Sequence, residues 1–333
     1  MIQTNRWENA LRQAITKPEE LLTILKLDNN LLEAAKTSAA LFPLKVPHSF
    51  VARMKPGDRH DPLLLQVLPI EAESFSHPDY VTDPLHEAAF NPVSGLFHKY
   101  HGRVLVTFVG TCAINCRYCF RRYFPYSENN PGTLGWDKAL HYIAKDSSIQ
   151  EVILSGGDPL IANDRTLTLF SEKLNQISHI KRLRIHSRIP IVLPERITPD
   201  FLKWTMQLQQ KPVLVVHCNH PQEINQSVRD AMQSLRNAGV VLLNQTVLLK
   251  GVNDSANTLI ELSETLFDAG IQPYYLHLLD KVDGAAHFDL NVQTAKTLYA
   301  EIEQHLSGYL VPKLVYEKAG APSKVSVSSL IIK

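Results

Sequence analysis

Three closely spaced cysteines are the residues of this chain best able to support chemistry. Cys112, Cys116 and Cys119 are separated by three and then two residues, and they are three of the four cysteines in the chain. A cubane iron–sulfur cluster has four irons, each normally held by one thiolate. Three local thiolates leave one iron open, and an open iron can bind and reduce a small molecule. The spacing therefore favours an iron–sulfur cluster with one open iron.

Zinc is the alternative for the same cysteines, because pairs two residues apart often hold this metal. Tetrahedral structural zinc needs a fourth ligand, and the chain has no second cysteine pair. Cys218 could supply that ligand only through a long-range contact, and a buried inert thiol is its more ordinary state. The spacing places the cluster ahead of zinc. A zinc-stabilised, non-catalytic binding module stays open as a hypothesis from a different class.

Composition limits the partners of the chain. Its 333 residues, 44% of them hydrophobic, are enough for one large catalytic domain and a smaller region. A net charge of +1 argues against nucleic acid or an anionic membrane as a general partner. No apolar run approaches the length of a membrane span, and the first residues lack the pattern of a signal peptide. We therefore expect a cytoplasmic protein, whose reducing surroundings keep thiolates and cluster intact.

The elements that must position the cysteines form two parts. Residues 1–92 read as helices, with Trp7, Leu11 and Ile15 at helical spacing and a second helix from Pro18 to Leu27, followed by a proline-rich wrapping connection. Residues 93–318 alternate apolar runs with amphipathic stretches, and residues 319–333 form a terminal segment. The candidate strands are Val104–Val109, Val152–Leu154, Leu183–His186, Val213–Val216, Val240–Leu243 and Tyr274–Leu278.

Strand–helix alternation predicts an α/β fold with a parallel sheet and right-handed crossovers. About six units are too few for a closed eight-stranded barrel. Periodicity leaves a partial barrel and an open doubly wound sheet both possible. In either fold the carboxyl ends of the strands form the active face. Polar residues follow several candidate strands, which favours an enzyme: Cys112, the run Ser155-Gly156-Gly157-Asp158, His217, Gln245 and Asp280.

Several segments together resemble the lysine 2,3-aminomutase family of radical S-adenosylmethionine (SAM) enzymes. The resemblance runs from about Asp83 to Lys324 and is carried by the cysteine run, Cys119–Arg122, Ser155–Asp158, Tyr274–His277 with Asp280, and Lys324. It is closest to the short bacterial branch called EpmB or YjeK, which is linked to β-lysylation of elongation factor P. The segments that fit this branch are Arg184–Arg188, Pro273–His277 and Gly308–Lys313. The resemblance implies a radical-SAM partial (β/α)6 barrel preceded by a mainly helical region.

The resemblance also implies an isomerase with three cofactors. A [4Fe-4S] cluster on Cys112, Cys116 and Cys119 would reduce SAM, and the resulting 5′-deoxyadenosyl radical would take hydrogen from C3 of L-lysine. Pyridoxal 5′-phosphate (PLP), joined to the substrate α-amino group, would let nitrogen migrate from C2 to C3 and give β-lysine. An electron donor such as a flavodoxin or ferredoxin, and a functional link to an elongation factor P ligase, follow from the same resemblance.

The family assigns roles to individual residues of this chain. Lys324 would hold PLP covalently, with Tyr100 and Arg103 as further PLP contacts. Arg121 would clamp the substrate carboxylate, and Asp280 and Glu317 would receive its ε-ammonium. The SAM side would be formed by Ser155, Gly156, Gly157, Asp158, His217 and Gln245. An aminomutase for another amino acid remains the alternative within this class. The cysteines that bind zinc in longer relatives have no counterpart here, so we expect no zinc.

Overall fold

One nine-stranded sheet forms the centre of the protein. The computed structural model describes residues 6–129 and 132–327. Its strands follow one another across the sheet in the order of the sequence, and β2 to β8 run parallel. The strands are β1 (Leu96–Tyr100), β2 (Arg103–Val109), β3 (Glu151–Gly156), β4 (Arg182–Ser187), β5 (Lys211–His217), β6 (Val241–Val247), β7 (Gln272–His277), β8 (Lys313–Tyr316) and β9 (Val325–Ser326).

The strand order decides between the two architectures left open by periodicity. A doubly wound sheet reverses its strand order at a switch point, whereas this order is sequential throughout. Side chains of β1 also bond across to Glu317, which directly follows β8. The sheet therefore curls until its two edges approach, as in a partial barrel. All six expected strands are present, as β2 to β7; the short parallel strand β8 was not expected.

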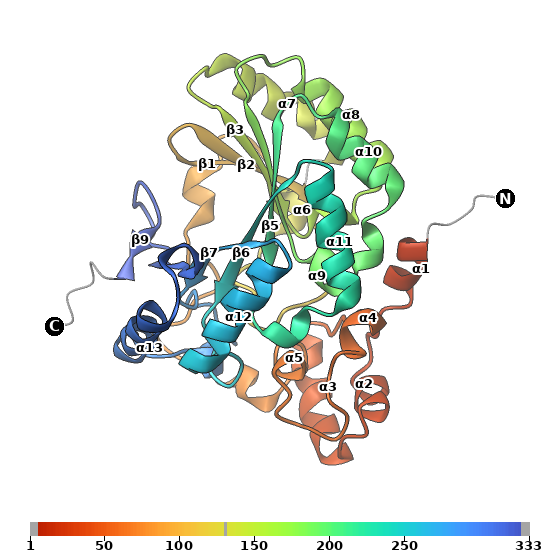
Figure 1. Cartoon of the computed structure of the whole chain (residues 1–333), viewed down its shortest axis with the longest axis vertical. Coiled ribbons are helices and arrows are strands. Elements are labelled where there is room, and N and C mark those ends of the chain that lie inside the picture. The colour runs from red at the N-terminus through yellow and green to blue at the C-terminus, as the bar shows by residue number, and fades with distance from the viewer. Residues whose placement is uncertain (1–5, 130–131, 328–333) are drawn as a thin grey trace.

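Helices cover the outer face of the sheet (Figure 1). Asp164–Leu174 and Gln226–Asn237 form α8 and α11, as their apolar spacing predicts. The α11 helix starts where the Asn225 side chain accepts a hydrogen bond from the Val228 amide, and the chain leaves it at Gly239, whose φ of 80° suits glycine. The other helices of the barrel are α6 (Tyr126–Asn129), α7 (Gly132–Lys145), α9 (Ile189–Val192), α10 (Pro199–Gln207), α12 (Ala256–Asp268) and α13 (Val292–His305).

The N-terminal region is mainly helical and packs against one end of the barrel (Figure 1). Its helices are α1 (Arg6–Arg12), α2 (Pro18–Ile24), α3 (Leu32–Leu41), α4 (His48–Val51) and α5 (Pro62–Leu65), and its 3₁₀ turns before β1 are η1 (Asn29–Leu31), η2 (Glu71–Ser74) and η3 (Glu87–Phe90). The first helix is shorter than expected. Its backbone gives way at Ile15, whose amide and carbonyl pair with Val46 instead of continuing the helix.

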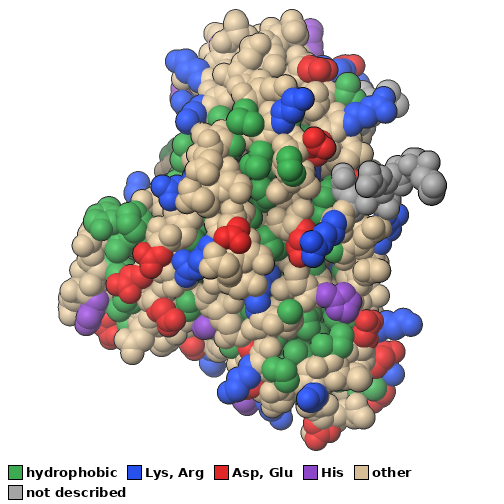
Figure 2. Space-filling view, turned by 45° about the vertical axis from the view of Figure 1, so that its right-hand side comes forward, with side chains coloured by type: hydrophobic (Ala, Val, Ile, Leu, Met, Phe, Trp, Pro, Cys, Tyr) green, Lys and Arg blue, Asp and Glu red, His purple; other side chains and the backbone are tan. Residues whose placement is uncertain are grey.

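Buried residues of both parts form one continuous core. Trp7, Leu22 and Phe50 belong to the same hydrophobic cluster as Val106 and Leu154 of the barrel. The boundaries at residues 92 and 318 stay predictions, but the two parts are held together by shared burial. Basic and acidic side chains are interspersed on the face shown in Figure 2. Within residues 6–129 and 132–327, none of the helices has the length and apolarity needed to cross a membrane.

Candidate active site

The cysteine loop follows β2 and is fixed by the N-terminal region. The amide of Asn115 donates to the carbonyl of Lys45 at 2.9 Å, and the amide of Arg117 donates to that of Gln66 at 2.9 Å. Burial raises the pKa of the Cys112 thiol well above its usual value and that of Cys119 to about 11. Thiolates at these positions therefore need the positive charge of bound metal, and metal binding would release their protons.

Zinc and a cubane cluster require different arrangements of the three thiols. In the described part of the chain, no three His, Cys, Asp or Glu side chains are grouped so that they could hold one metal ion. Zinc needs its thiolates about 2.3 Å from one point, whereas each thiolate of a cubane cluster holds a different iron. Cys218 is buried and its thiol donates to the carbonyl of His220. The donor set of three separate thiols fits the cluster better than zinc.

A buried carboxylate neutralises two arginines of the cysteine loop. Glu73, on η2, accepts from the Nε of Arg117 at 2.8 Å and from its Nη2 at 2.5 Å. The same carboxylate accepts from the Nη2 of Arg122 at 2.9 Å. All three side chains are almost completely removed from water. Such charges are tolerated in the interior only when paired, so Glu73 holds the loop in place.

The glycine run after β3 lies against the same loop. A Cβ atom added to Gly157 would lie 2.2 Å from the carbonyl oxygen of Thr111, so only glycine fits this close approach. The neighbouring carboxylate of Asp158 accepts from the Ser187 hydroxyl at 2.7 Å and from the Arg188 amide at 2.7 Å. The expected SAM contacts of this motif stay predictions. The contacts seen position the cysteine loop and the turn after β4.

Arg121 pairs with an acid that the sequence did not suggest. Its Nε lies 2.8 Å from one carboxylate oxygen of Glu87, on η3, and its Nη2 lies 2.5 Å from the other. The remaining Nη1 reaches the Ser155 hydroxyl at 3.4 Å and the carbonyl of Gly156 at 3.5 Å. The side chain is buried, and Glu87 overcomes that burial to raise its pKa further. Arg121 therefore stays charged, with its Nη1 edge only weakly bonded.

Lys324 lies in a cluster of charged groups around Glu317. The Nζ of Lys324 is 2.5 Å from one carboxylate oxygen of Glu317. The other oxygen accepts from the hydroxyl of Tyr100 at 2.5 Å and from the Nζ of Lys99 at 3.1 Å. Burial alone would raise the pKa of Glu317, but Lys324 and these hydrogen bonds lower it to about 2. The arrangement keeps Lys324 inside the barrel beside a permanent negative charge.

Arg103 and Tyr100 face each other where β1 turns into β2. The guanidinium of Arg103 lies 4.6 Å from the centre of the Tyr100 ring. Both side chains are close enough to Tyr275 to interact electrostatically with it. The ring centre of Tyr275 is 5.4 Å from the Nζ of Lys324. The structure thus brings three predicted PLP residues together, and an arginine beside a lysine suits a phosphorylated aldehyde.

Asp280 is the least satisfied acid of the site. In residues 6–129 and 132–327, its carboxylate takes part in no hydrogen bond or ion pair that the structure shows. Burial raises its pKa to about 7, and nearby Lys324 only partly opposes this shift. Glu317 and Glu87 are close enough to raise it further. This carboxylate lacks a cation, which an ammonium group of a substrate could supply.

Three histidines line the space between these groups, at the ends of β4, β5 and β7. Burial lowers the pKa of His217 to about 3 and those of His186 and His277 well below their usual value, so all three are neutral. Gln245 donates its amide to the Nε2 of His217 at 3.1 Å. The Nε2 atoms of His186 and His277 are buried without a partner in the described residues. The charge of Lys324 helps to lower the pKa of all three rings, so the three histidines lie near the lysine that is expected to bind PLP.

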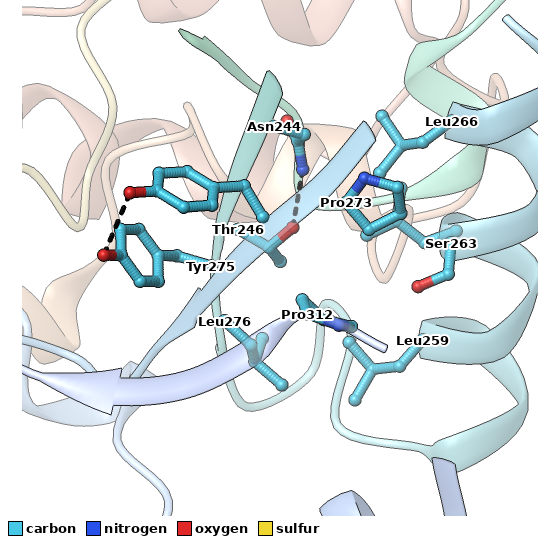
Figure 3. A pocket seen from close by; sticks show the side chains of 11 residues that line it. Asn244, Thr246, Leu259, Ser263, Leu266, Pro273, Tyr275, Leu276 and Pro312 are labelled. Carbon is cyan, nitrogen blue, oxygen red and sulfur yellow. Dashed lines mark hydrogen bonds between the residues drawn. The ribbon is translucent and has the colours of Figure 1, made fainter. Parts of the chain in front are cut away.

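The cavity shown in Figure 3 is separate from this site. It lies between β6, β7 and α12, and its walls are mostly apolar: Leu259, Leu262, Leu266, Pro273, Leu276 and Pro312. Its space is about that of one water molecule. At its edge the hydroxyl of Tyr274 donates to that of Tyr275 at 3.0 Å, drawn as a dashed line in Figure 3. The cavity is a packing gap behind the wall of the site.

Comparison with known proteins identifies the family. The L-lysine 2,3-aminomutase of Escherichia coli (strain K12) is 49% identical over 319 residues, which cover 96% of this chain and 93% of that protein. This chain belongs to the lysine 2,3-aminomutase family. The enzyme of the same name from Haemophilus influenzae is 47% identical, over 97% of this chain and 95% of its own length. A family profile described as "4Fe-4S single cluster domain" matches residues 100–185, which contain the three cysteines.

More distant members of the lysine 2,3-aminomutase family differ in length. The protein of this name from Clostridium subterminale is 36% identical over 97% of this chain, but over only 78% of its own length. The near end-to-end matches are thus with the shorter relatives.

A solved structure titled as a radical SAM methyltransferase from Sphaerobacter thermophilus covers 68% of this chain and 69% of its own, with 16% identity and a TM-score of 0.47.

Sequence reasoning did not find Glu87, the free nitrogen of His277 or the role of Arg188. Each depends on the folded arrangement and not on a local pattern: Glu87 and its partner Arg121 are 34 residues apart, and the Nε2 of His277 has no partner in the described residues. The one signal that the sequence offers for Glu87 is its place in the proline-rich connection before β1. That signal names no partner, so it could not have assigned a role.

Proposed function

We propose that this chain is an L-lysine 2,3-aminomutase, an isomerase that moves the amino group of lysine from C2 to C3. The observation that carries the proposal is the presence of opposite charges at the two ends of one site. The charges of Arg121 and Lys324 are both close enough to His186 to lower its pKa. The charges of Lys324 and of Glu87, the partner of Arg121, are likewise close enough to shift the pKa of Asp280. A substrate with a carboxylate at one end and an ammonium at the other fits this charge distribution, and membership of the family supports it.

Lysine would be oriented by these charged ends. The Nη1 edge of Arg121 would receive the substrate carboxylate, while Glu87 keeps the guanidinium in position from the other side. The ε-ammonium would lie against Asp280, which has no cation of its own, with Glu317 as the second acid. Two acids at this end favour lysine over an amino acid with an acidic side chain. Fixing both ends would hold C2 and C3 in a defined place between them.

The residues present fit the cofactors that the family implies. Cys112, Cys116 and Cys119 would hold a [4Fe-4S] cluster whose open iron binds SAM, with Gly156, Gly157, His217 and Gln245 on the SAM side. Lys324 would hold PLP, with Arg103 at its phosphate and Tyr100 close by. When bound, these groups supply a hydrogen-abstracting radical and an electron sink for amino migration. Glu317, 2.5 Å from the Nζ of Lys324, would hold this side chain in place beside PLP.

Burial around the site would protect this chemistry. The neutral imidazoles of His186, His217 and His277 surround the reactive centre without offering an acidic proton, because their pKa values are far below neutrality. Closing the site against solvent and other molecules would prevent side reactions of the reactive species. The protein contributes orientation and exclusion, while the cofactors carry the difficult steps.

The test is an anaerobic assay with isotope-labelled L-lysine. The chain is reconstituted with iron and sulfide, then given SAM, PLP and a strong reductant, and products are followed by mass spectrometry and NMR. Formation of β-lysine together with 5′-deoxyadenosine is expected. Formation of 5′-deoxyadenosine alone would indicate another amino acid as substrate, and a panel of amino acids would then identify it. A cluster-loaded chain that forms neither product would overturn the proposal.

We also propose that the β-lysine is used by a ligase that modifies elongation factor P, in the cytoplasm, and that a flavodoxin or ferredoxin supplies the electron. Support comes from the similarity of three segments to the short bacterial branch and from the near end-to-end match with two shorter relatives. The test couples this enzyme and a flavodoxin to the ligase and elongation factor P in one reaction. A mass increase on elongation factor P that depends on this chain is expected; free β-lysine without that increase would contradict the link.

A further inference from the structure

Arg188 contacts one of the three cysteines through an almost completely buried side chain. It follows β4 directly, and its Nη1 lies 2.8 Å from the Sγ of Cys116. Its Nη2 donates to the Oε1 of Gln66 at 2.6 Å and to the Oε2 of Glu223 at 3.0 Å. The mechanism proposed above gives this arginine no task. A buried cation at a sulfur that would hold iron is the strongest unexplained contact of the molecule.

The position of Arg188 is fixed from several sides. Its guanidinium lies 5.3 Å from the ring centre of Phe50 and 5.7 Å from that of Tyr118, and its amide donates to Asp158. Gln66 and Glu223 are themselves entirely buried. The short helix α9, which starts right after Arg188, lies where the barrel meets the N-terminal helices (Figure 1). A side chain held this firmly is a preorganised donor and cannot follow a moving substrate.

We propose that Arg188 is a positioning residue of the cluster, which donates a hydrogen bond to the Cys116 sulfur and thereby makes the cluster easier to reduce. The inference rests on the proposed function, since it requires the cluster. When one electron from a flavodoxin or ferredoxin enters a cluster, negative charge on its irons and sulfurs increases. A donor and a positive charge beside a ligand sulfur stabilise that reduced form, and hydrogen bonds to the sulfurs are a recognised determinant of cluster potential.

Glu223 limits the size of this effect. Its carboxylate lies 3.0 Å from Arg188 and would offset part of the arginine charge. SAM cleavage needs a cluster at the low end of the range of cluster potentials, while the electron donor must still be able to reduce it. An arginine whose charge is partly balanced satisfies both requirements: it supplies the hydrogen bond without raising the potential too far.

The test is a redox titration of the reconstituted full-length chain, followed by electron paramagnetic resonance. In R188Q the ratio of reduced to oxidised cluster, at the wild-type midpoint, should fall about tenfold, which is a downward shift of about 59 mV for a one-electron couple. Iron and sulfide content should stay unchanged. R188K, which keeps the charge but loses the planar fork, should shift less. R196Q is the matched control, since Arg196 is also a buried arginine and its partners are Leu160, Ala162 and Asp164.

A second variant protects the test against loss of the cluster in R188Q. In E223Q the arginine keeps its contact with Cys116 but loses its opposing charge, so the midpoint should move upward. Unchanged midpoints in cluster-loaded R188Q and E223Q would overturn the inference and leave the proposed function intact. Equal shifts in R188Q and R196Q would also overturn it. A wild-type chain that binds no [4Fe-4S] cluster would overturn both proposals.

Discussion

Replacing Asp280 by asparagine should make the folded chain more stable and its binding of lysine weaker. Burial raises the pKa of this carboxyl from 3.8 to about 7, and Lys324 opposes the shift only in part. Above pH 7 the folded and the unfolded chain both carry the ionised form, and the folded chain bears the full cost of burying it. One pKa unit corresponds to about 1.36 kcal/mol, so the rise costs up to about 4 kcal/mol, which D280N should recover.

The pH dependence of this gain has a defined sign. Because the pKa is higher in the folded state, lowering the pH protonates Asp280 in the folded chain first. Its destabilising effect therefore disappears between about pH 7 and pH 4, by about 1.4 kcal/mol per unit. D280N has no such carboxyl. The difference in unfolding free energy between D280N and wild type should be largest at pH 8 and decrease as the solution becomes more acidic.

Lysine binding should change in the opposite direction. Removing one partner of a buried ion pair costs about 3–5 kcal/mol, which is about a hundredfold loss of affinity or more. In the wild type, protonation of Asp280 should have the same effect, with affinity falling up to about tenfold per pH unit below 7. D280N should lose that part of the pH dependence as well as the affinity.

Two measurements check this reasoning. Chemical unfolding of the PLP-free chain at pH 8 and pH 6 gives the stability, and lysine KM of the loaded enzyme over the same range gives the affinity. D283N is the matched control, because Asp283 is a nearby acid whose carboxylate accepts from the Tyr123 hydroxyl at 3.2 Å. A D280N chain less stable than wild type at pH 8 would refute the burial argument. An unchanged lysine KM would exclude Asp280 from the substrate site.

Three further changes test other parts of the site. E87Q keeps the shape of the side chain but removes its charge. Loss of a charged hydrogen bond, worth about 1.5–3 kcal/mol, should raise the lysine KM about tenfold or more without loss of iron. An unaltered KM would exclude Glu87 from holding Arg121. K324A should fail to retain PLP after gel filtration while keeping its cluster, as seen by absorbance and iron analysis. G157A should lower stability by about 1–3 kcal/mol through overpacking and reduce iron content, whereas G308A, with no atom within 4 Å of an added Cβ, should do neither.

The barrel was predictable because its signals are local. Each of the strands β2 to β7 contains a short apolar or alternating pattern of ordinary strand length, and α8 and α11 carry their caps and apolar spacing within a dozen residues. Strand β8 could not be predicted because its four residues are too few to show a hydrophobic periodicity. The first helix is predicted to reach Ile15 because Ile15 fits the helical spacing, but the helix ends at Arg12. Ile15 instead pairs with Val46, which is 31 residues away in the sequence.

The site was predictable only where spacing carries the chemistry. The three cysteines identify themselves by their gaps, and the roles of Lys324, Asp280 and Arg121 came from resemblance, not from local pattern. What could not be predicted is which acid faces which base. The pairing of Glu317 with Lys324 spans seven residues, but that of Tyr100 with Glu317 spans 217. Such contacts depend on how far the sheet curls, and no local pattern encodes curvature.

The N-terminal region is best understood as part of the active site. The cysteine loop and the turn after β4 bring buried cations close to the three half-buried cysteines, and buried cations without partners are strongly destabilising. The partners come from the wrapping connection: Glu73 for Arg117, Glu87 for Arg121 and Gln66, with Glu223, for Arg188. Without the wrapping connection, Arg117 and Arg121 would lose their carboxylate partners, and Arg188 would keep only Glu223 of the barrel. The wrapping connection therefore balances the charge of the arginines around the cysteines as well as covering them. This role explains why the N-terminal region shares one core with the barrel.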